Sequence, residues 1–338
     1  MNQDYIKSDP WSIIEEGFDA ERVKSSESLF SIGNGAMGQR ANFEEQYSGP
    51  TFQGSYIGGV YYPDKTRVGW WKNGYPEYFA KVLNAPNWIG INVRVNGEDL
   101  DLHNCEVIGD FRRELNMKEG WLSRSFKAVL KNGIEIRIKA LRFLSLVDGE
   151  LGVIKYEITP INENAEIEFL PYLDIGISNE DSNWDDQFWQ TTNIQHEDGM
   201  AFIEAHTLKT FFHTCTFMKS QCFLNNEIIE LEPEVETAEN RISFRYRCKV
   251  GQNQTFGIHK FGGYVVDRNH DKNELVSKAK SVLKNAFTKG FDSLLVDQKN
   301  AWAEIWNMAD ITIDGDVKAQ QGIRFNIFQL NQTYLGKD

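Results

Sequence analysis

One acidic stretch holds the carboxylates of this sequence that could support acid catalysis. It includes Trp184, precedes Trp189 and contains four acids: Glu180, Asp181, Asp185 and Asp186. Cleavage of a glycosidic bond uses two carboxyl groups on opposite faces of a sugar, roughly 5 to 10 Å apart. Sequence spacing does not set that distance, and a run of acids in a polar loop is more often a solvated surface. The aromatic neighbours favour a contact with a sugar or another domain over catalysis.

A glycine pattern raises the possibility of a nucleotide site. Gly33, Gly35 and Gly38 have the G-x-G-x-x-G spacing of a dinucleotide-binding turn. That turn needs a strand before it and a helix of several turns after it, with the pyrophosphate at the helix N-terminus. Here Gly49-Pro50 breaks the chain soon after the pattern, with no apolar stripe between. We interpret Asn34-Gly35 instead as backbone that needs a positive φ or a close approach.

Histidine and cysteine spacing predicts no metal site. His206 and His213 are too far apart for one helical face and lie in strand-like sequence, where histidines are usually satisfied structural groups. The four cysteines, at 105, 215, 222 and 248, have no C-x-x-C spacing, which favours buried thiols in a reducing compartment. No G-x-S-x-G motif of an esterase is present.

An aromatic stretch from Phe52 to Trp88 follows neither a helical nor a strand period. It includes Trp70, Trp71, Tyr75 and Tyr78 among Gly, Pro, Lys and Arg. Flat aromatic faces beside hydrogen-bond donors are suited to sugar rings, which have apolar C–H faces and polar rims. The alternative is that these side chains fill a core or cover another domain.

Composition limits the class of protein. The chain has 338 residues and a formal net charge of -13, which argues against a nucleic-acid or anionic-membrane partner. The N-terminal residues lack the basic and apolar regions of a signal peptide, and no run of about eighteen apolar residues occurs. We therefore expect an acidic, soluble, cytoplasmic protein.

Strand signals dominate up to about residue 267. Two hairpins are predicted at Asn-Gly turns, over 88–102 around Asn96-Gly97 and over 125–141 around Asn132-Gly133. In the second, isoleucines at 134, 136 and 138 alternate with charged residues, so one face is expected to be core. Further strands are predicted over 151–158, 165–173, 200–205, 211–217, 241–250 and 254–266. This pattern predicts a large antiparallel β-sandwich over residues 1–267.

The periodicity then becomes helical. Apolar stripes from Asn273 to Gly290 and from Leu294 to Trp306 predict two helices, in a linker over 268–310. A short strand is expected at Ile311–Asp314, and a third helix over 317–334. Because that helix begins a new architecture close to residue 338, the sequence is expected to be a fragment.

Three segments resemble glycoside hydrolase family 65. They are SLFSIGNGAMGQRANFEE, YYPDKTRVGWWKNGYPEYFAKVLNAPNWIGINV and, near the end, QQGIRFNIFQLNQTY. The insert VGWWKNGYPEYFAK is most similar to the members of this family that act on maltose. The resemblance implies a galactose-mutarotase-like supersandwich, a helical linker, and an (α/α)6 barrel of which residues 311–338 are the start.

The resemblance also implies an activity. The family reaction is inverting phosphorolysis of an α-glucoside, in which maltose and phosphate give β-glucose 1-phosphate and glucose. A glutamic acid protonates the glycosidic oxygen while phosphate attacks from the opposite face. That glutamate and the phosphate pocket are expected beyond residue 338, so no catalytic residue is assigned here. A homodimer is implied, with inorganic phosphate as co-substrate and no further cofactor or metal.

The candidate substrate-binding residues follow from these segments. We expect the loop from Trp70 to Tyr78, including Trp71 and Tyr75, to reach over the barrel opening and shape the acceptor end of the sugar site. Arg324 and Asn326 could face the barrel mouth, although structural pairing explains them equally well. The exposed aromatics also predict that the isolated fragment self-associates.

Alternative functions remain open from sequence. The substrate could be kojibiose, trehalose or nigerose, or the protein could be a related glycoside hydrolase. A stand-alone carbohydrate-binding module is a second class. An aldose epimerase is a third, which would need a histidine and a carboxylate converging on one sugar pocket.

Overall fold

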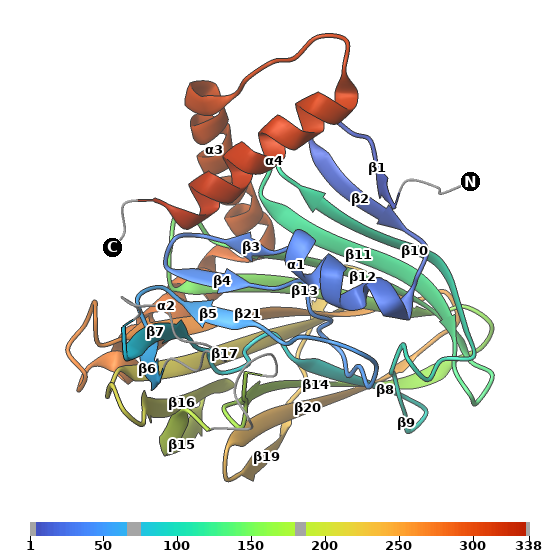
Figure 1. Cartoon of the computed structure of the whole chain (residues 1–338). Helices are drawn as coiled ribbons and strands as arrows, with labels where there is room; N and C mark the ends of the chain where they lie inside the picture. Colours follow the sequence, from blue (N-terminus) through green and yellow to red (C-terminus); the bar gives the residue numbers. More distant parts are fainter. Residues whose placement is uncertain (1–4, 66–75, 180–186, 336–338) are drawn as a thin grey trace.

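The computed structural model describes residues 5–65, 76–179 and 187–335. Its described part is mainly an antiparallel β-sandwich, over which helices gather at one end (Figure 1). An eleven-stranded sheet faces a five-stranded one, and two small sheets of three and two strands lie beside them. The predicted fold class, a sandwich followed by helices, is confirmed.

The large sheet runs in the order β1-β2-β10-β11-β12-β13-β21-β17-β16-β15, with β18 paired to β17. Its strands are β1 (Ile6–Lys7), β2 (Ser12–Glu16), β10 (Val107–Asn116), β11 (Trp121–Val129), β12 (Glu135–Leu144), β13 (Leu151–Pro160), β15 (Trp189–Glu197), β16 (Met200–Thr207), β17 (His213–Leu224), β18 (Glu227–Ile229) and β21 (Phe256–Val266).

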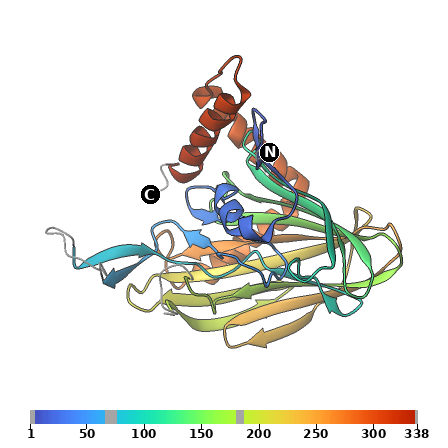
Figure 2. The same ribbon diagram turned by 45° about the vertical axis from the view of Figure 1, so that its right-hand side comes forward.

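The other sheets are smaller. The five-stranded sheet consists of β19 (Glu234–Ala238), β20 (Arg241–Val250), β14 (Ala165–Asp174), β8 (Ile91–Val95) and β9 (Glu98–Asp99). The three-stranded sheet consists of β3 (Ile32–Gly33), β4 (Met37–Gln39) and β5 (Ser55–Ile57). A hairpin of β6 (Tyr61–Lys65) and β7 (Tyr78–Val82) extends beyond the sandwich (Figure 2).

The helices lie near the start and at the end of the chain. They are η1 (Ala20–Arg22), α1 (Val23–Leu29), α2 (Leu275–Lys289), α3 (Phe291–Ala309) and α4 (Val317–Thr333). Because α2 packs its apolar stripe on β17 and β21, it covers the face of the large sheet that is turned away from the sandwich interior. None of the helices in the described ranges is long and apolar enough to cross a membrane.

Both predicted Asn-Gly hairpins are present. At β8–β9 the central residues Asn96 and Gly97 have φ values of 50° and 82°, the left-handed conformation that a two-residue hairpin turn requires. At β11–β12 Val129 pairs with Glu135, and the isoleucines at 134, 136 and 138 are buried, as their alternation predicted. Alternating burial sets the register, because a slip of one residue would expose that whole face.

The strand predicted at Ile311–Asp314 is absent. The Gln320 side chain accepts a hydrogen bond from Ile313 N at 2.6 Å and donates one to Ile311 O at 2.9 Å. A side chain of α4 therefore satisfies backbone groups that a neighbouring strand would have bound. The segment is an irregular connection between α3 and α4.

Trp88 fills the centre of the sandwich. Its side chain is fully buried, and it lies against Gly152 of β13 and Gly262 of β21. A Cβ at Gly152 would lie 2.3 Å from Trp88 Cη2, which leaves no room for any other residue. Part of the aromatic stretch is therefore core rather than ligand platform, and the same holds for Tyr62, which is 6% exposed and packs on Phe188.

Candidate functional site

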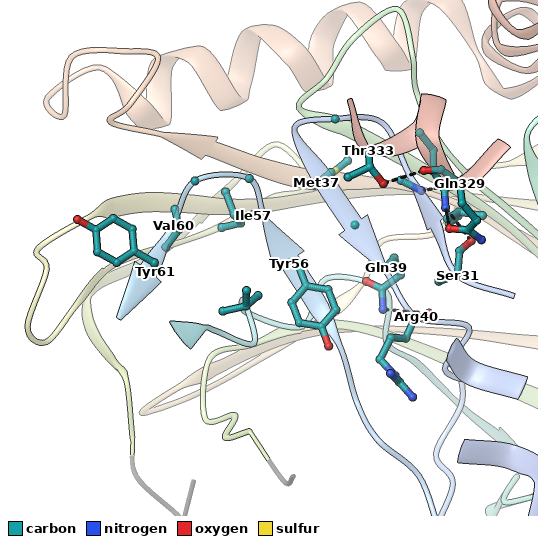
Figure 3. A pocket seen from close by; sticks show the side chains of 18 of the residues that line it. Ser31, Met37, Gln39, Arg40, Tyr56, Ile57, Val60, Tyr61, Gln329 and Thr333 are labelled. Atoms are coloured by element: carbon teal, nitrogen blue, oxygen red, sulfur yellow. Dashed lines mark hydrogen bonds between the residues drawn. The ribbon is translucent and has the colours of Figure 1, made fainter. Parts of the chain in front are cut away.

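A groove of about 550 Å³ lies between the three-stranded sheet, the β6–β7 hairpin and the C-terminal end of α4. Figure 3 shows its lining, with Tyr61 at one end and Gln329 and Thr333 of α4 at the other. The three segments on which the family resemblance rests all reach this groove. They contribute the strands β3 and β4, the hairpin and the last turn of α4, whereas β5 lies between the first two segments.

The glycine pattern is the contact surface for α4. Gly33 N donates to Gln332 Oε1 and Gly35 N donates to Gln332 O, both at 2.8 Å. A Cβ at Gly33 would lie 3.1 Å from that carbonyl oxygen, and Gly35 has a φ of 79°. The predicted positive φ and close approach are thus confirmed at Gly35. Gly38 lies in the strand β4, whereas the last glycine of a dinucleotide-binding turn opens a helix. The glycine pattern therefore does not form such a turn here.

Asn34 holds this loop to the large sheet. Its buried side chain donates to Ser145 O at 2.9 Å and Gly149 O at 3.1 Å. Its Oδ1 atom accepts from Ala36 N and Met37 N. One amide therefore fixes both the turn and its distance from the sandwich.

Arg40 and Tyr56 form the polar wall of the groove. Their side chains extend from neighbouring strands in the same direction (Figure 3) and flank Gly54, where a Cβ would lie 2.2 Å from Arg40 Cδ and 2.6 Å from Tyr56 Oη. Arg40 Nη2 donates to Lys24 O at 3.1 Å, whereas its Nε atom is buried without a hydrogen-bond partner among the described residues. The wall thus combines donors with an aromatic ring, as polyhydroxylated ligands require.

The groove is suited to binding rather than to acid–base chemistry. Among the described residues that line it, none is a histidine, aspartate or glutamate. Amides, hydroxyls, an arginine and exposed backbone can orient a ligand, but proton transfer at a glycosidic oxygen needs a carboxylic acid or an equivalent. An epimerase would need its histidine and carboxylate here, and the described lining provides neither.

Carboxylates of the first resembling segment serve structural ion pairs instead. Arg124 contacts Glu45 Oε2 at 2.5 Å and Glu44 Oε2 at 2.8 Å, and Arg142 contacts Glu44 Oε1 at 3.0 Å. Burial acts to raise the pKa of Glu44, but the charges of Arg142 and Arg124 outweigh it and lower that pKa. Glu44 is therefore held ionised between Arg124 and Arg142, and Glu45 is a buried partner of Arg124.

The predicted sugar-binding loop is only partly within the described residues. Trp70, Trp71 and Tyr75 lie outside them, whereas Tyr78 is 54% exposed at the start of β7. Tyr78 pairs with Lys65 across the hairpin and does not line the groove. The hairpin contributes Tyr61, Ala80 and Val82 to the groove, which sequence periodicity did not indicate.

Arg324 is held away from the groove. Its Nε and Nη2 atoms donate to the two carboxylate oxygens of Asp310, each at 2.8 Å, and its Nη1 atom donates to Pro10 O. The guanidinium also lies 3.5 Å from the ring centre of Trp11. Structural pairing, the alternative for this residue, is what the structure shows, and Asn326 lies on the exposed side of α4.

The α4 residues that do line the groove are Gln329, Gln332 and Thr333. Gln332 Nε2 also donates to Gln329 Oε1 at 2.7 Å, which fixes both amides. Their i, i+3, i+4 spacing on a predicted helix was the available sequence signal. Sequence reasoning missed it because the partner glycines lie about three hundred residues away.

The acidic stretch is not placed, since residues 180–186 lie outside the described ranges. Trp189, which follows it, is 6% exposed and donates from Nε1 to Asn84 O at 2.7 Å. That ring is part of the core and is not available to stack on a ligand.

The described residues thus form a two-sheet sandwich with a helical extension, and the groove between them is lined by amides, hydroxyls, an arginine and backbone. The family model described as "Glycosyl hydrolase family 65, N-terminal domain" matches residues 13–305. The chain belongs to this family.

Similar proteins include disaccharide phosphorylases. The maltose phosphorylase of Bacillus subtilis (strain 168) is 42% identical over 338 residues, which cover 100% of this chain and 44% of that protein. The alpha,alpha-trehalose phosphorylase of Thermoanaerobacter brockii is 29% identical, over 97% of this chain and 43% of that protein. A solved structure of a putative kojibiose phosphorylase from the human microbiome matches with a TM-score of 0.88 and 26% identity, over 99% of this chain and 43% of that one. The chain thus spans less than half the length of these relatives.

Proposed function

We propose that this chain is the N-terminal part of an inverting disaccharide phosphorylase that converts maltose and phosphate to β-glucose 1-phosphate and glucose. The observation that carries the proposal is the identity of 42% to a maltose phosphorylase across all of this chain, against 29% to a trehalose phosphorylase. The protein is proposed to be cytoplasmic and dimeric, with phosphate as its only co-substrate.

The chain itself is proposed to be non-catalytic. The described groove residues include no proton donor of the kind that glycosidic cleavage needs, and the carboxylates of the first resembling segment are locked in ion pairs. The catalytic glutamic acid and the phosphate-binding groups are proposed to lie in the rest of the protein. The groove and the β6–β7 hairpin then position that part and shape the acceptor end of its sugar site.

A phosphorolysis assay on the full-length protein tests the proposal. Maltose, trehalose, kojibiose and nigerose are each supplied with inorganic phosphate, and glucose 1-phosphate and its anomer are measured. We expect β-glucose 1-phosphate from maltose with a kcat/KM at least about tenfold above the other disaccharides, a difference of roughly 1.4 kcal/mol in the transition state. Preference for another disaccharide, or hydrolysis without phosphate, would reject the maltose assignment.

Shortening the hairpin tests the role of the loop from Trp70 to Tyr78. A variant in which an Asn-Gly turn replaces residues 66–77 keeps the pairing of β6 with β7. We expect its KM for maltose to rise several-fold with a smaller change in kcat, because the loop would bind the acceptor sugar without touching the reacting atoms. Val235→Ala, on the remote edge strand β19, serves as the control. Unchanged kinetics in the shortened variant would show that the loop does not bind the acceptor sugar.

A second candidate function is a carbohydrate-binding module. It is favoured because residues of this chain form the groove and supply its hydrogen-bond donors. Titration of maltose and maltotriose into the 338-residue chain would distinguish the two. Binding that Arg40→Ala abolishes would support the module. We expect no measurable binding at millimolar sugar, since the groove is proposed to position the remainder of a larger enzyme.

A further inference from the structure

Two histidines face each other at the end of the β16–β17 hairpin. His206 pairs directly with His213 in the strand register, and Thr207 N donates to Phe212 O at 3.0 Å. That bond makes the histidine pair a non-hydrogen-bonded position of the ladder, where facing side chains approach most closely. The sequence expectation considered a single helical face, whereas the hairpin places these two histidines side by side.

The separation of the two rings is compatible with two ligands of one metal ion. Their centroids are 5.5 Å apart and the ring planes are tilted by 36°. Two imidazoles that bind one tetrahedral cation at about 2.0 Å have ring centroids about 5 Å apart. The observed centroid distance is therefore close to that of two imidazole ligands of one ion.

A carboxylate orients one of the rings. Asp267, which follows β21, lies with its Oδ2 atom 2.9 Å from His213 Nδ1. When Nδ1 donates its proton to this carboxylate, Nε2 keeps the lone pair that a metal needs. The negative charge also favours a cation nearby.

The second ring is positioned by stacking. The His206 ring lies parallel to Phe211, with centroids 5.6 Å apart and planes 15° from parallel. Stacking covers the ring face and leaves the ring edge, which carries the nitrogen atoms. His206 Nδ1 is buried without a hydrogen-bond partner in the described ranges, so Nε2 is the nitrogen that remains for a ligand.

The turn between β16 and β17 places Phe211 against the His206 ring in an uncommon backbone conformation. Phe211 has a φ of 55°, a left-handed conformation that is uncommon for a bulky residue, and its side chain is 61% exposed. Phe211 therefore gains little from burial and is held where it stacks on His206. Thr210 Oγ1 donates to Tyr61 O at 2.9 Å, which connects the same turn to the β6–β7 hairpin.

We propose that His206 and His213 form a site for a borderline divalent cation, Zn²⁺ or Cu²⁺, with Asp267 as the orienting carboxylate and water in the remaining positions. Within the described ranges no group of three or more His, Cys, Asp or Glu side chains gathers for a metal. The affinity is therefore below that of a structural zinc site with four protein ligands. Imidazole ligands favour Cu²⁺ over Zn²⁺, following the general order of divalent affinities.

Calorimetric titration of Zn²⁺ into the metal-free 338-residue chain, in a buffer that does not chelate, tests the site. We expect one equivalent to bind. His206→Ala and His213→Ala should each weaken binding at least about tenfold, and Asp267→Asn by about tenfold, as for other residues that orient metal ligands. His270→Ala is the matched control, because His270 Nε2 also contacts a carboxylate, Glu150 Oε1 at 2.5 Å, and we find no second histidine paired with it in the described part.

A second measurement needs no variant. In the electron paramagnetic resonance spectrum of the wild-type chain with one equivalent of Cu²⁺, we expect hyperfine coupling to two imidazole nitrogens. The proposal is overturned by any of three results: no bound equivalent of Zn²⁺, an affinity that His206→Ala or His213→Ala leaves unchanged, or coupling to a single nitrogen.

Discussion

Single buried polar residues connect the two sheets of the sandwich. Lys260 of β21 is fully buried, and its Nζ atom donates to Gly90 O and to Tyr172 O, both at 2.8 Å. The first acceptor precedes β8 and the second lies on β14, so one side chain joins the large sheet to the five-stranded one. Burial lowers the pKa of Lys260 well below its usual range, and Arg241 adds to this effect.

Lys260→Met should reveal this shift as a pH-dependent stability difference. Because the folded protein holds the Lys260 proton less tightly than the unfolded chain, the unfolded state binds more protons between the two pKa values. The wild type therefore gains stability over the variant as pH rises from the depressed folded pKa towards about 10.4, by up to about 1.4 kcal/mol per pH unit.

Urea unfolding of both proteins between pH 7 and 9.5 measures this difference. Lys249→Met, on the exposed side of β20, controls for the loss of one positive charge. A stability difference that stays constant over this range would show that Lys260 is as easily protonated in the folded protein as in the unfolded chain.

At the scale of elements, α4 is fixed in its middle and at its last turn by side chains rather than by an apolar stripe alone. Arg324 holds its middle to Asp310 and Pro10, and Gln332 holds its last turn to Gly33 and Gly35. Phe328 adds a stacked contact with Trp302 of α3, with centroids 4.5 Å apart. The position of α4, and hence the width of the groove, depends on these few contacts.

Arg324→Ala should destabilise the chain by about 2 kcal/mol, because the carboxylate of Asp310 loses a partner in a partly buried pair. The Asp310 carboxylate is 25% exposed, so the cost is smaller than for a fully buried ion pair. Arg324→Lys should recover only part of this, since an ammonium cannot bind both carboxylate oxygens in the planar geometry of a guanidinium. Asn326→Ala on the exposed side of the same helix should stay within about 0.5 kcal/mol of wild type. Equal effects of Arg324→Ala and Asn326→Ala in urea unfolding would contradict the structural role.

Local patterns predicted the elements that local chemistry determines. The Asn-Gly turns, the alternating isoleucines and the apolar stripes of α2 and α3 were all readable, because each depends on neighbours within one turn or one hairpin. Several strands were not predicted, among them β10 and β15. The strand β15 gave no strand signal because it is largely polar and lies at the edge of its sheet. The partner of each groove residue lies far away in the sequence, so residue type alone could not identify Gln332 as the partner of Gly33.

At the scale of the whole molecule, the linker helices and the sandwich share one core. Trp302 of α3 lies over Gly120, where a Cβ would come within 1.7 Å of Trp302 Nε1. Trp306 Nε1 donates to Met117 O at 2.9 Å, and Gln298 Nε2 donates to Gly120 O at 2.9 Å. The last strand ends at Val266 and α2 begins at Leu275, yet the predicted boundary at residue 267 separates segments that pack together.

We therefore expect α2, α3 and the large sheet to unfold as one cooperative unit. Gly120 has a φ of 70°, so Gly120→Ala adds both backbone strain and overlap with Trp302 and should cost about 2 kcal/mol or more. Native-state hydrogen exchange measures where that loss appears. The most protected amides of α3, β12 and β21 should lose the same free energy of opening in the variant, whereas Asn326→Ala, on the exposed side of α4, should leave them within about 0.5 kcal/mol of wild type. Loss of protection confined to α2, α3 and α4 would show instead that the helices form a separate unit, in agreement with a domain boundary at residue 267.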